Sequence, residues 1–376
     1  MLPFEQSKFM RRIARSLIWR WRRRHAEERI RLQRLILDSS EMIGIDVGAA
    51  DGLQPHWWSF EGVAQMYLFE PHEESANKLR TLYAASPYAG MFHVMPTGLG
   101  AVTGVRDFYM LNAPTGSSLY PIDPSSEFAG PDNHYVYPIR ASKVQVRRLA
   151  EVLDEENVPR VDIAKLDVQG GELEILQGLD EKRFSSLVLV EAEVNIAGGI
   201  TKTMSPYIGV PTWSAMDEFL LSRGMRLLDL SVARNHRAKG GDGDWYQREV
   251  FDTYSNSPGV SAAAWEADVV YIRDYRSLIA AGNAPALRRL VVALCGYRFF
   301  SEAFFTIEQA SNAGVFTGEQ GNSINEAVGD WHRLTARRPW HGRGRFWRLW
   351  RGVLRRLGLA QYRRWKQYMW FDYPNG

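Results

Sequence analysis

Two acids and one histidine stand close to places where a strand is expected to end, and such side chains are suited to acid–base chemistry. Asp167 follows the apolar run 161–166, Glu193 ends the run 187–193, and His72 follows a strand-like run that ends at residue 70. Ligands bind at the carboxyl ends of strands in open α/β sheets. A hydroxyl group is a poor nucleophile that benefits from a general base. Asp167, Glu193 and His72 are therefore our candidate catalytic residues.

Other roles for the same acids stay open at this point. Asp167 and Glu193, together with Asn195, offer the oxygen ligands that a divalent metal prefers. Glu193 is equally well placed to be a structural or helix-capping acid.

A ligand-binding turn is predicted near the start of the chain. Residues 42–47 form an apolar run, residues 48–52 are small or acidic, and an aromatic segment at 53–60 has the character of a helix. Strand, tight turn and helix make the first unit of a doubly wound α/β domain. Gly48 and Gly52 let the backbone approach a ligand closely. Asp46 is expected at the mouth of this turn, although a plain tight connection would have the same composition.

The next strand, 65–70, ends in Glu70, 18 residues after Gly52. An acid at this position can bind the hydroxyl groups of a ribose. The glycines follow the pattern Gly-x-x-x-Gly and not Gly-x-Gly-x-x-Gly. This spacing argues against a dinucleotide cofactor, and hence against a dehydrogenase. It suits a nucleoside without a pyrophosphate, such as S-adenosylmethionine.

Apolar periodicity predicts the elements that must position these residues. A turn is predicted at 96–100, and Thr212 is a candidate helix cap. The polar segment 112–133 is long for a connection, so it is either a binding loop or a disordered insertion. Strands are expected at 91–95, 105–111, 135–146, 161–166, 187–193, 225–230 and 267–273, and helices at 73–85, 149–156, 173–179 and 212–222.

Composition indicates a folded protein without disulfides. The chain has 376 residues, of which 45% are hydrophobic and 24% charged. Its single cysteine, Cys295, excludes an intramolecular disulfide and a cysteine-based zinc site, and apolar neighbours favour a buried, inert thiol. The sequence shows neither a secretory signal nor an apolar run long enough to span a membrane. A cytoplasmic location is therefore expected.

Positive charge gathers at the two ends. Residues 1–36 and 335–376 each contain 11 Lys or Arg, whereas the part between them has 24 basic and 39 acidic residues. Residues 4–36 are predicted to form a basic amphipathic helix, and 285–376 a mainly helical tail. Such stripes can lie on an anionic membrane surface, here as a peripheral contact on its inner face, or pack on the acidic body of the protein itself. The predicted domains are 1–40, 41–284 and 285–376.

Three motifs, taken together, carry a resemblance to a known family. They are Ile-Asp-Val-Gly-Ala-Ala-Asp-Gly at 45–52, Phe-Glu-Pro at 69–71 and Lys-Leu-Asp-Val-Gln-Gly-Gly-Glu at 165–172. The ordered set resembles the FkbM family of S-adenosylmethionine-dependent methyltransferases over roughly 42–275. The resemblance implies a Rossmann-like methyltransferase fold: a seven-stranded, mostly parallel sheet with helices on both faces and the last strand antiparallel. The helical N- and C-terminal extensions lie outside it.

The resemblance also implies roles for individual residues. Asp167 would stand beside the transferring methyl group, and Glu70 would hold the ribose. Two departures from the family pattern are Gly170-Gly171, where Gly-Ala is usual, and 147–150, where a Leu-Asp pair is usual. The methionine end of the cofactor would be lined by Asp46, Gly48, Ala49 and Gly52, and the adenine would lie near Gly98 and Leu99.

The implied reaction is O-methylation of a sugar in a cell-surface glycan, or of a natural product. One alternative is a nucleic-acid (RNA) methyltransferase, suggested by the basic ends. Against it, the chain lacks an Asn-Pro-Pro-Tyr-like motif and a catalytic cysteine pair. Another alternative is a non-catalytic scaffold at a membrane, which the intact cofactor motif disfavours.

Overall fold

The computed structural model describes residues 25–38, 40–50, 52–111, 116–123, 138–196, 207–235 and 263–336. The chain divides into two compact units. The first contains Ile43–Asp51 and Met66–Asp274, and the second contains Met1–Met42, Gly52–Gln65 and Tyr275–Gly376. We call them the sheet unit and the helical unit. The domain boundaries drawn from the sequence stay a prediction.

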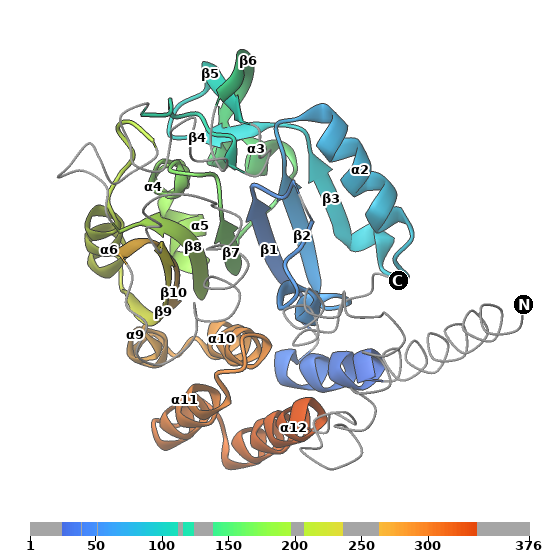
Figure 1. The fold of residues 1–376 in the computed structure, drawn as a ribbon. Helices are drawn as coiled ribbons and strands as arrows, with labels where there is room; N and C mark the ends of the chain where they lie inside the picture. The colour runs from blue at the N-terminus through green and yellow to red at the C-terminus, as the bar shows by residue number, and fades with distance from the viewer. Residues whose placement is uncertain are drawn as a thin grey trace, which may run out of the picture. The chain divides into compact units, whose positions relative to one another are not determined.

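A seven-stranded sheet with the order β3-β2-β1-β7-β8-β10-β9 forms the centre of the sheet unit (Figure 1). The pairs β2–β3, β1–β7 and β7–β8 are parallel, and only β10 runs antiparallel to its neighbours β8 and β9. The predicted fold class is confirmed. The strands are β1 (Met42–Val47), β2 (Ala64–Phe69), β3 (Phe92–Met95), β7 (Ile163–Leu166), β8 (Leu189–Asn195), β9 (Met225–Asn235) and β10 (Ala263–Arg273).

The register of the central strands brings their ends to one edge. Val47 of β1 pairs with Leu166 of β7, and Leu166 pairs with Ala192 of β8. Every residue of β1 and of β7 is buried, as expected for parallel strands covered on both faces. The residues that follow β1 and β7 therefore lie beside the end of β8.

A second, three-stranded sheet has the order β4-β6-β5. It contains β4 (Gly98–Gly100), β5 (Gly104–Leu111) and β6 (Pro138–Arg148). The strands predicted at 105–111 and 135–146 correspond to β5 and β6. The prediction of a turn at 96–100 was wrong. Residues 98–100 are buried and pair in parallel with β6, so they form a short strand.

Helices pack against both sheets. Thr212 caps α6 as predicted, because its side chain accepts a hydrogen bond from the backbone N–H of Ala215. Leu149, Leu176 and Leu220 place α3, α4 and α6 against the buried core, which also holds side chains of β1, β7, β8 and β10. The helices of this unit are α2 (Glu73–Ala84), α3 (Leu149–Glu155), α4 (Glu172–Gln177), α5 (Glu181–Ser186) and α6 (Trp213–Ser222).

The helical unit has a core of its own, and it corrects one prediction. The segment 53–60 is not a regular helix: only η1 (Trp57–Phe60) is helical, as a single 3-10 turn. Trp57 and Phe60 are fully buried, and the side chain of Gln33 donates to the carbonyl of Ser59 across 2.8 Å. The unit also contains a helical stretch at 25–37 and the helices α9 (Tyr275–Ala280), α10 (Ala284–Gly296), α11 (Phe300–Asn312) and α12 (Gly318–Ala336).

The structure describes only the inner part of each basic end. Residues 25–37 continue the predicted N-terminal helix, and α9–α12 confirm a helical tail as far as residue 336. Residues 1–24 and 337–376 lie outside the described residues.

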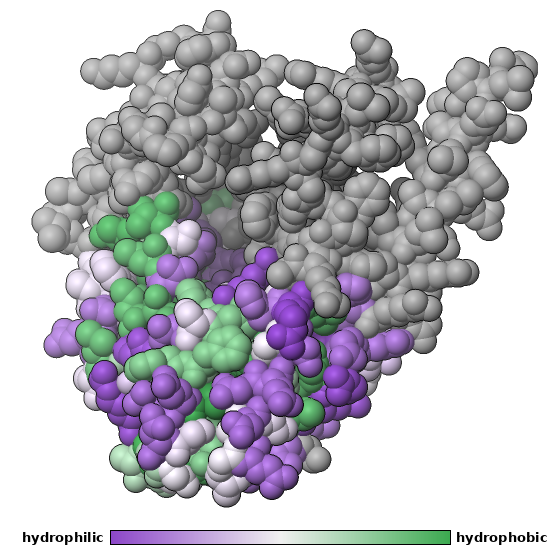
Figure 2. Space-filling model, turned by 90° about the horizontal axis from the view of Figure 1, so that it is seen from below, coloured by the Kyte–Doolittle hydropathy of each residue, from purple (hydrophilic) through white to green (hydrophobic). Residues whose placement is uncertain are grey.

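Cys295 is buried, as predicted. On the face drawn in Figure 2, hydrophobic residues are interspersed with hydrophilic ones. Within the described ranges, no helix has both the length and the apolar character needed to span a membrane.

Candidate active site at the strand ends

The turn after β1 is built around Gly48. Its φ is +86°, and a Cβ placed on it would lie 1.8 Å from the carbonyl oxygen of Asp167. The backbone N–H groups of Gly48 and Ala49 both donate to the carbonyl of Phe69, at 3.1 and 3.2 Å. The N–H of Asp167 donates to the carbonyl of Val47 at 3.0 Å. The turn is thus fixed between the ends of β2 and β7, and it tolerates no side chain at Gly48.

Asp46, two residues before Gly48, is fully buried. Its Oδ1 lies 3.6 Å from Nζ of Lys165, which donates to Oδ2 of Asp167 at 3.1 Å. Burial raises the pKa of Asp46 to about 6, because desolvation outweighs the attraction of Lys165. Burial opposes the charge of Lys165, but the neighbouring carboxylates of Asp46, Asp167 and Glu191 raise its pKa above the ordinary value.

Glu70 stands at the end of β2, as predicted, and is buried. Its Oε1 accepts a hydrogen bond from the backbone N–H of His72 at 2.8 Å. The ring of His72 lies 3.4 Å from the hydroxyl of Ser75, in the first turn of α2. His72 therefore helps to set the orientation of the Glu70 carboxylate through its backbone.

Gly98 and Leu99 are brought close to the same strand end. A Cβ on Gly98 would lie 3.7 Å from Cβ of Pro71, the residue after Glu70. Leu99 is buried in the core of the sheet unit. Gly98, predicted for the adenine end, thus lies near the residue that follows Glu70.

Asp167 and Glu193 meet through a residue that sequence reasoning missed. The side-chain amide of Gln169 donates to Oδ1 of Asp167 at 3.2 Å and to Oε1 of Glu193 at 2.5 Å. Both oxygens of Asp167 are engaged, since Oδ2 accepts from Lys165. The only signal in the sequence was a polar side chain two positions beyond Asp167.

Glu172 stabilises the turn that carries Gln169 by accepting hydrogen bonds from its backbone. The Glu172 carboxylate is buried and accepts hydrogen bonds from the backbone N–H groups of Val168 and Gly170, at 2.9 and 3.0 Å. Burial raises its pKa to about 7, while these backbone hydrogen bonds act in the opposite direction.

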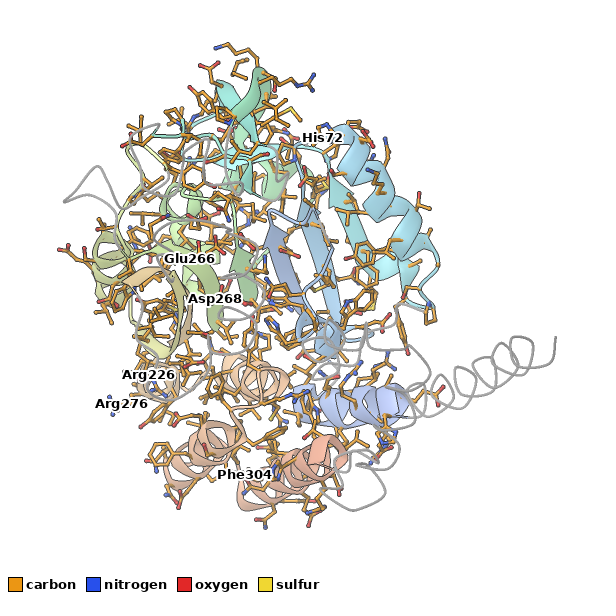
Figure 3. The ribbon with its side chains drawn as sticks, in the orientation of Figure 1. His72, Arg226, Glu266, Asp268, Arg276 and Phe304 are labelled. Carbon is orange, nitrogen blue, oxygen red and sulfur yellow. The ribbon has the colours of Figure 1, made fainter. Side chains whose placement is uncertain are left out.

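Two more acids reach this region from β10. Asp268 pairs with Glu193 in the sheet register, and Glu266 pairs with Asn195 (Figure 3). Burial, followed by the charges of Asp167 and Glu266 among others, raises the pKa of Glu193 well above its ordinary value. Burial and the neighbouring Asp268 and Asp167 raise the pKa of Glu266 to about 8. This edge of the sheet is strongly acidic.

The structure separates the predicted catalytic residues into two places. His72 follows β2, which is three strands away from β8 in the sheet order, or about 14 Å at the usual strand spacing. Figure 3 shows His72 well apart from Glu266 and Asp268 of β10. His72 is therefore not part of the hydrogen-bonded group of Asp167, Gln169 and Glu193. Gly52 has a φ of +81° and belongs to the helical unit, and Asp51 lies outside the described residues.

Three of the oxygen atoms considered for a metal accept hydrogen bonds within the protein. The Gln169 amide lies between Asp167 and Glu193, and Lys165 takes the second oxygen of Asp167. Across the described ranges, no three His, Cys, Asp or Glu side chains are arranged to hold a metal ion.

The sheet order with one antiparallel strand is that of the Rossmann-like methyltransferase fold. Residues 46–227 match the family model of the methyltransferase FkbM domain. This match confirms the resemblance drawn from the motifs over that part of the chain.

Three known proteins illustrate the extent of the similarity. "Methyltransferase 1" of Beauveria bassiana is 32% identical over 87 residues, which cover 22% of this chain and 35% of that protein. The crystal structure of methyltransferase FkbM from Methylobacillus flagellatus is 14% identical, with a TM-score of 0.31, over 62% of this chain and 43% of that one. M. capricolum TrmK in complex with S-adenosyl-homocysteine is 8% identical, with a TM-score of 0.29, over 81% and 97%. The chain thus spans less than half of the length of the first two proteins.

The residues present fit the S-adenosylmethionine that this family implies. Gly48 leaves a backbone turn that no side chain can fill, and Glu70 is buried at the next strand end with its carboxylate oriented by His72. Gly48, Ala49, Glu70, Gly98 and Leu99 would hold the cofactor. Asp46 pairs with Lys165, which in turn donates to Asp167 at the end of β7.

Proposed function

We propose that this protein is an S-adenosylmethionine-dependent methyltransferase that methylates a hydroxyl group of a neutral acceptor. The observation that carries the proposal is the contact between the Gly48 turn and Asp167, which joins the cofactor turn directly to the acid pair. The match to the FkbM domain supports the same reading. The acceptor class is a sugar of a cell-surface glycan or a natural product.

The arrangement favours Glu193 as the general base. When bound, the cofactor supplies an electrophilic methyl group, so the protein must align an acceptor oxygen and take up its proton. Both acids accept a hydrogen bond from Gln169, but Asp167 also accepts one from Lys165, whereas Glu193 is surrounded by acids that favour binding of a proton. A raised pKa makes the ionised form of Glu193 a stronger proton acceptor than an ordinary carboxylate. Asp167 would then keep Glu193 and the cofactor turn at a fixed position relative to each other.

The acidity of this edge supports a neutral acceptor over nucleic acid. Asp167, Glu172, Glu193, Glu266 and Asp268 all contribute to the charge felt there. A phosphodiester backbone would be repelled by each of these carboxyl groups that is ionised. The intact arrangement of Gly48, Glu70 and Asp167 also speaks against a non-catalytic scaffold.

Isothermal titration calorimetry of the whole chain tests the cofactor part of the proposal. We expect binding of S-adenosylhomocysteine and none of NADH. Glu70→Ala should weaken binding by about 1–3 kcal/mol, since hydrogen bonds to a charged acceptor are lost. The matched control is Glu74→Ala, which removes an exposed acid of α2 paired with Lys78. Binding of NADH in place of the demethylated cofactor would contradict the proposal.

The acceptor is tested by mass spectrometry of cell-surface glycans and small metabolites from cells with and without the gene. We expect a methyl ether on a hydroxyl group that disappears with the gene and with Glu193→Gln. A methylated RNA base that disappears instead would favour the nucleic-acid alternative.

A further inference from the structure

Gln169 holds a backbone conformation that residues other than glycine rarely adopt. Its φ is +61°, in the turn between β7 and α4, and Gly170 follows with a φ of +117°. A left-handed conformation costs free energy for a residue with a Cβ, and such strain gathers at functional sites. The side chain at position 169 therefore needs an explanation beyond the geometry of the turn.

The side-chain amide of Gln169 uses both of its N–H groups on carboxylates. One N–H faces Asp167 and the other faces Glu193, at the 3.2 and 2.5 Å given above. Without a donor between them, two carboxylates in adjacent strand ends repel each other. The amide thus keeps two acids side by side while each remains hydrogen-bonded.

Tyr207 fixes which way the amide points. Its hydroxyl lies 2.9 Å from Oε1 of Gln169 and 2.7 Å from the carbonyl oxygen of Gly116. The single hydroxyl proton can serve both acceptors only as a three-centre hydrogen bond. In that arrangement it donates in part to the amide oxygen, and the amide nitrogen is turned toward the carboxylates. A reversed amide would place its oxygen against Asp167 and Glu193, which are themselves acceptors.

The backbone of the same residue is held by Ser118. Its hydroxyl donates to the carbonyl of Gln169 at 2.8 Å. Ser118 is bridged to Tyr109 of β5, and Tyr207 is bridged to Ile122. Segments from two distant parts of the sequence therefore converge on Gln169.

We propose that Gln169 and Tyr207 are positioning residues for methyl transfer: the Tyr207 hydroxyl orients the Gln169 amide, and the amide holds Asp167 and Glu193 beside the Gly48 turn. This inference rests on the proposed function and extends it to two residues that need not contact the acceptor. Gln169 ties the acid that contacts the cofactor turn to the acid that would receive the proton.

The charged groups that face Glu193 set the sign of the expected effect. Asp167 faces it from the end of β7, Glu172 from α4, and Glu266 and Asp268 from β10. These charges favour the protonated form of Glu193, whereas the Gln169 amide donates to its charged form. Loss of the amide must therefore raise the pH at which Glu193 titrates.

The test is a ¹³C NMR titration of the whole chain labelled at the glutamate carboxyl carbons. The Glu193 signal is the one that Glu193→Gln removes. Gln169→Leu should raise its titration midpoint by about 1–2 pH units, which corresponds to one hydrogen bond to a charged acceptor. Tyr207→Phe should raise it by less, because the amide remains but is free to turn.

Tyr120→Phe is the matched control. Tyr120 shares a small buried cluster with Tyr207, but its hydroxyl bonds to Glu174 and not to Gln169. The Tyr120→Phe substitution should leave the titration midpoint of Glu193 unchanged. If Gln169→Leu does not fold, Tyr207→Phe decides the question.

A Glu193 midpoint that neither variant moves would overturn the positioning role. Calorimetry with S-adenosylhomocysteine on the native chain tests the proposed function separately. Absence of that binding refutes the proposed function, whereas an unmoved midpoint refutes only this inference.

Discussion

At the scale of single residues, the cofactor turn depends on the absence of one side chain. Gly48 combines a positive φ with a position where a Cβ would overlap the carbonyl oxygen of Asp167. Neither the backbone of β1 nor that of β7 can yield easily, because both strands are buried and paired.

Gly48→Ala should therefore abolish binding of S-adenosylhomocysteine and destabilise the fold by about 1–3 kcal/mol from backbone strain alone. Gly90→Ala is the matched control, since its Cβ would meet nothing within 4 Å. Calorimetry and thermal unfolding measure the two effects. Native affinity in Gly48→Ala would show that the turn is not the cofactor site.

Glu266 makes stability depend on pH. Its pKa is raised from 4.5 to about 8, first by burial and then by Asp268 and Asp167. The folded state binds this proton more tightly than the unfolded state, so stability falls as the pH rises from about 4.5 to about 8. Glu266→Gln should therefore raise the melting temperature progressively over this range, relative to the native protein.

Thermal unfolding at pH values from 5 to 9 measures the difference in melting temperature between Glu266→Gln and the native protein. Glu218→Gln, on the exposed side of α6, is the control. A difference between Glu266→Gln and the native chain that stays constant with pH would contradict the assignment.

At the scale of elements, one buried arginine joins the ends of two helices to the last strand. Arg273 of β10 donates from Nε to the carbonyl of Leu187 at 3.0 Å and from Nη2 to that of Phe184 at 2.6 Å. Its Nη1 donates to the carbonyl of Arg223. These carbonyls lie in or just beyond the last turns of α5 and α6, where helices have unpaired acceptors.

Arg273→Met should destabilise the sheet unit by about 2–4 kcal/mol, because buried carbonyls lose their charged donor. Urea unfolding measures the change, and Lys182→Met on the exposed face of α5 is the control. An effect as small as that of the control would mean that these carbonyls find other donors.

At the scale of the whole molecule, the basic ends remain a prediction because residues 1–24 and 337–376 are not described. The predicted stripes through Leu17, Trp21, Phe346 and Trp350 fall in these segments. The structure shows only how the N-terminal helix continues. Ile36 is buried, and its carbonyl accepts from Arg288 of α10 at 2.9 Å. Residues 25–37 thus belong to the core of the helical unit.

A membrane test must therefore leave residues 25–37 in place. We expect the intact chain to sediment with vesicles containing anionic lipid at low salt, and a chain lacking 1–24 and 337–376 to stay in the supernatant. Each basic side chain near such a surface contributes about 1 kcal/mol. A matched melting temperature for the two chains controls for folding. An intact chain that stays in the supernatant would exclude the membrane contact.

The sequence by itself determined the fold class, the strand ends and most of the residues placed at them. Short-range patterns suffice here, because an apolar run followed by Gly48 or Asp167 marks both a buried strand and its end. Local spacing could not show that Leu53–Phe60 forms only one 3-10 turn, because Trp57 and Phe60 are drawn into the core of the helical unit.

Only the tertiary structure decided how the acids are connected. Gln169 contacts Glu193 across 24 positions and Tyr207 across 38, and Glu266 reaches the same edge through an antiparallel pairing. It also placed the buried Asp46 carboxylate 3.6 Å from Lys165. Such contacts depend on which strands are neighbours, and the chemistry of a carboxylate depends on its burial and on the charges around it. Neither is encoded in the spacing of residues along the chain.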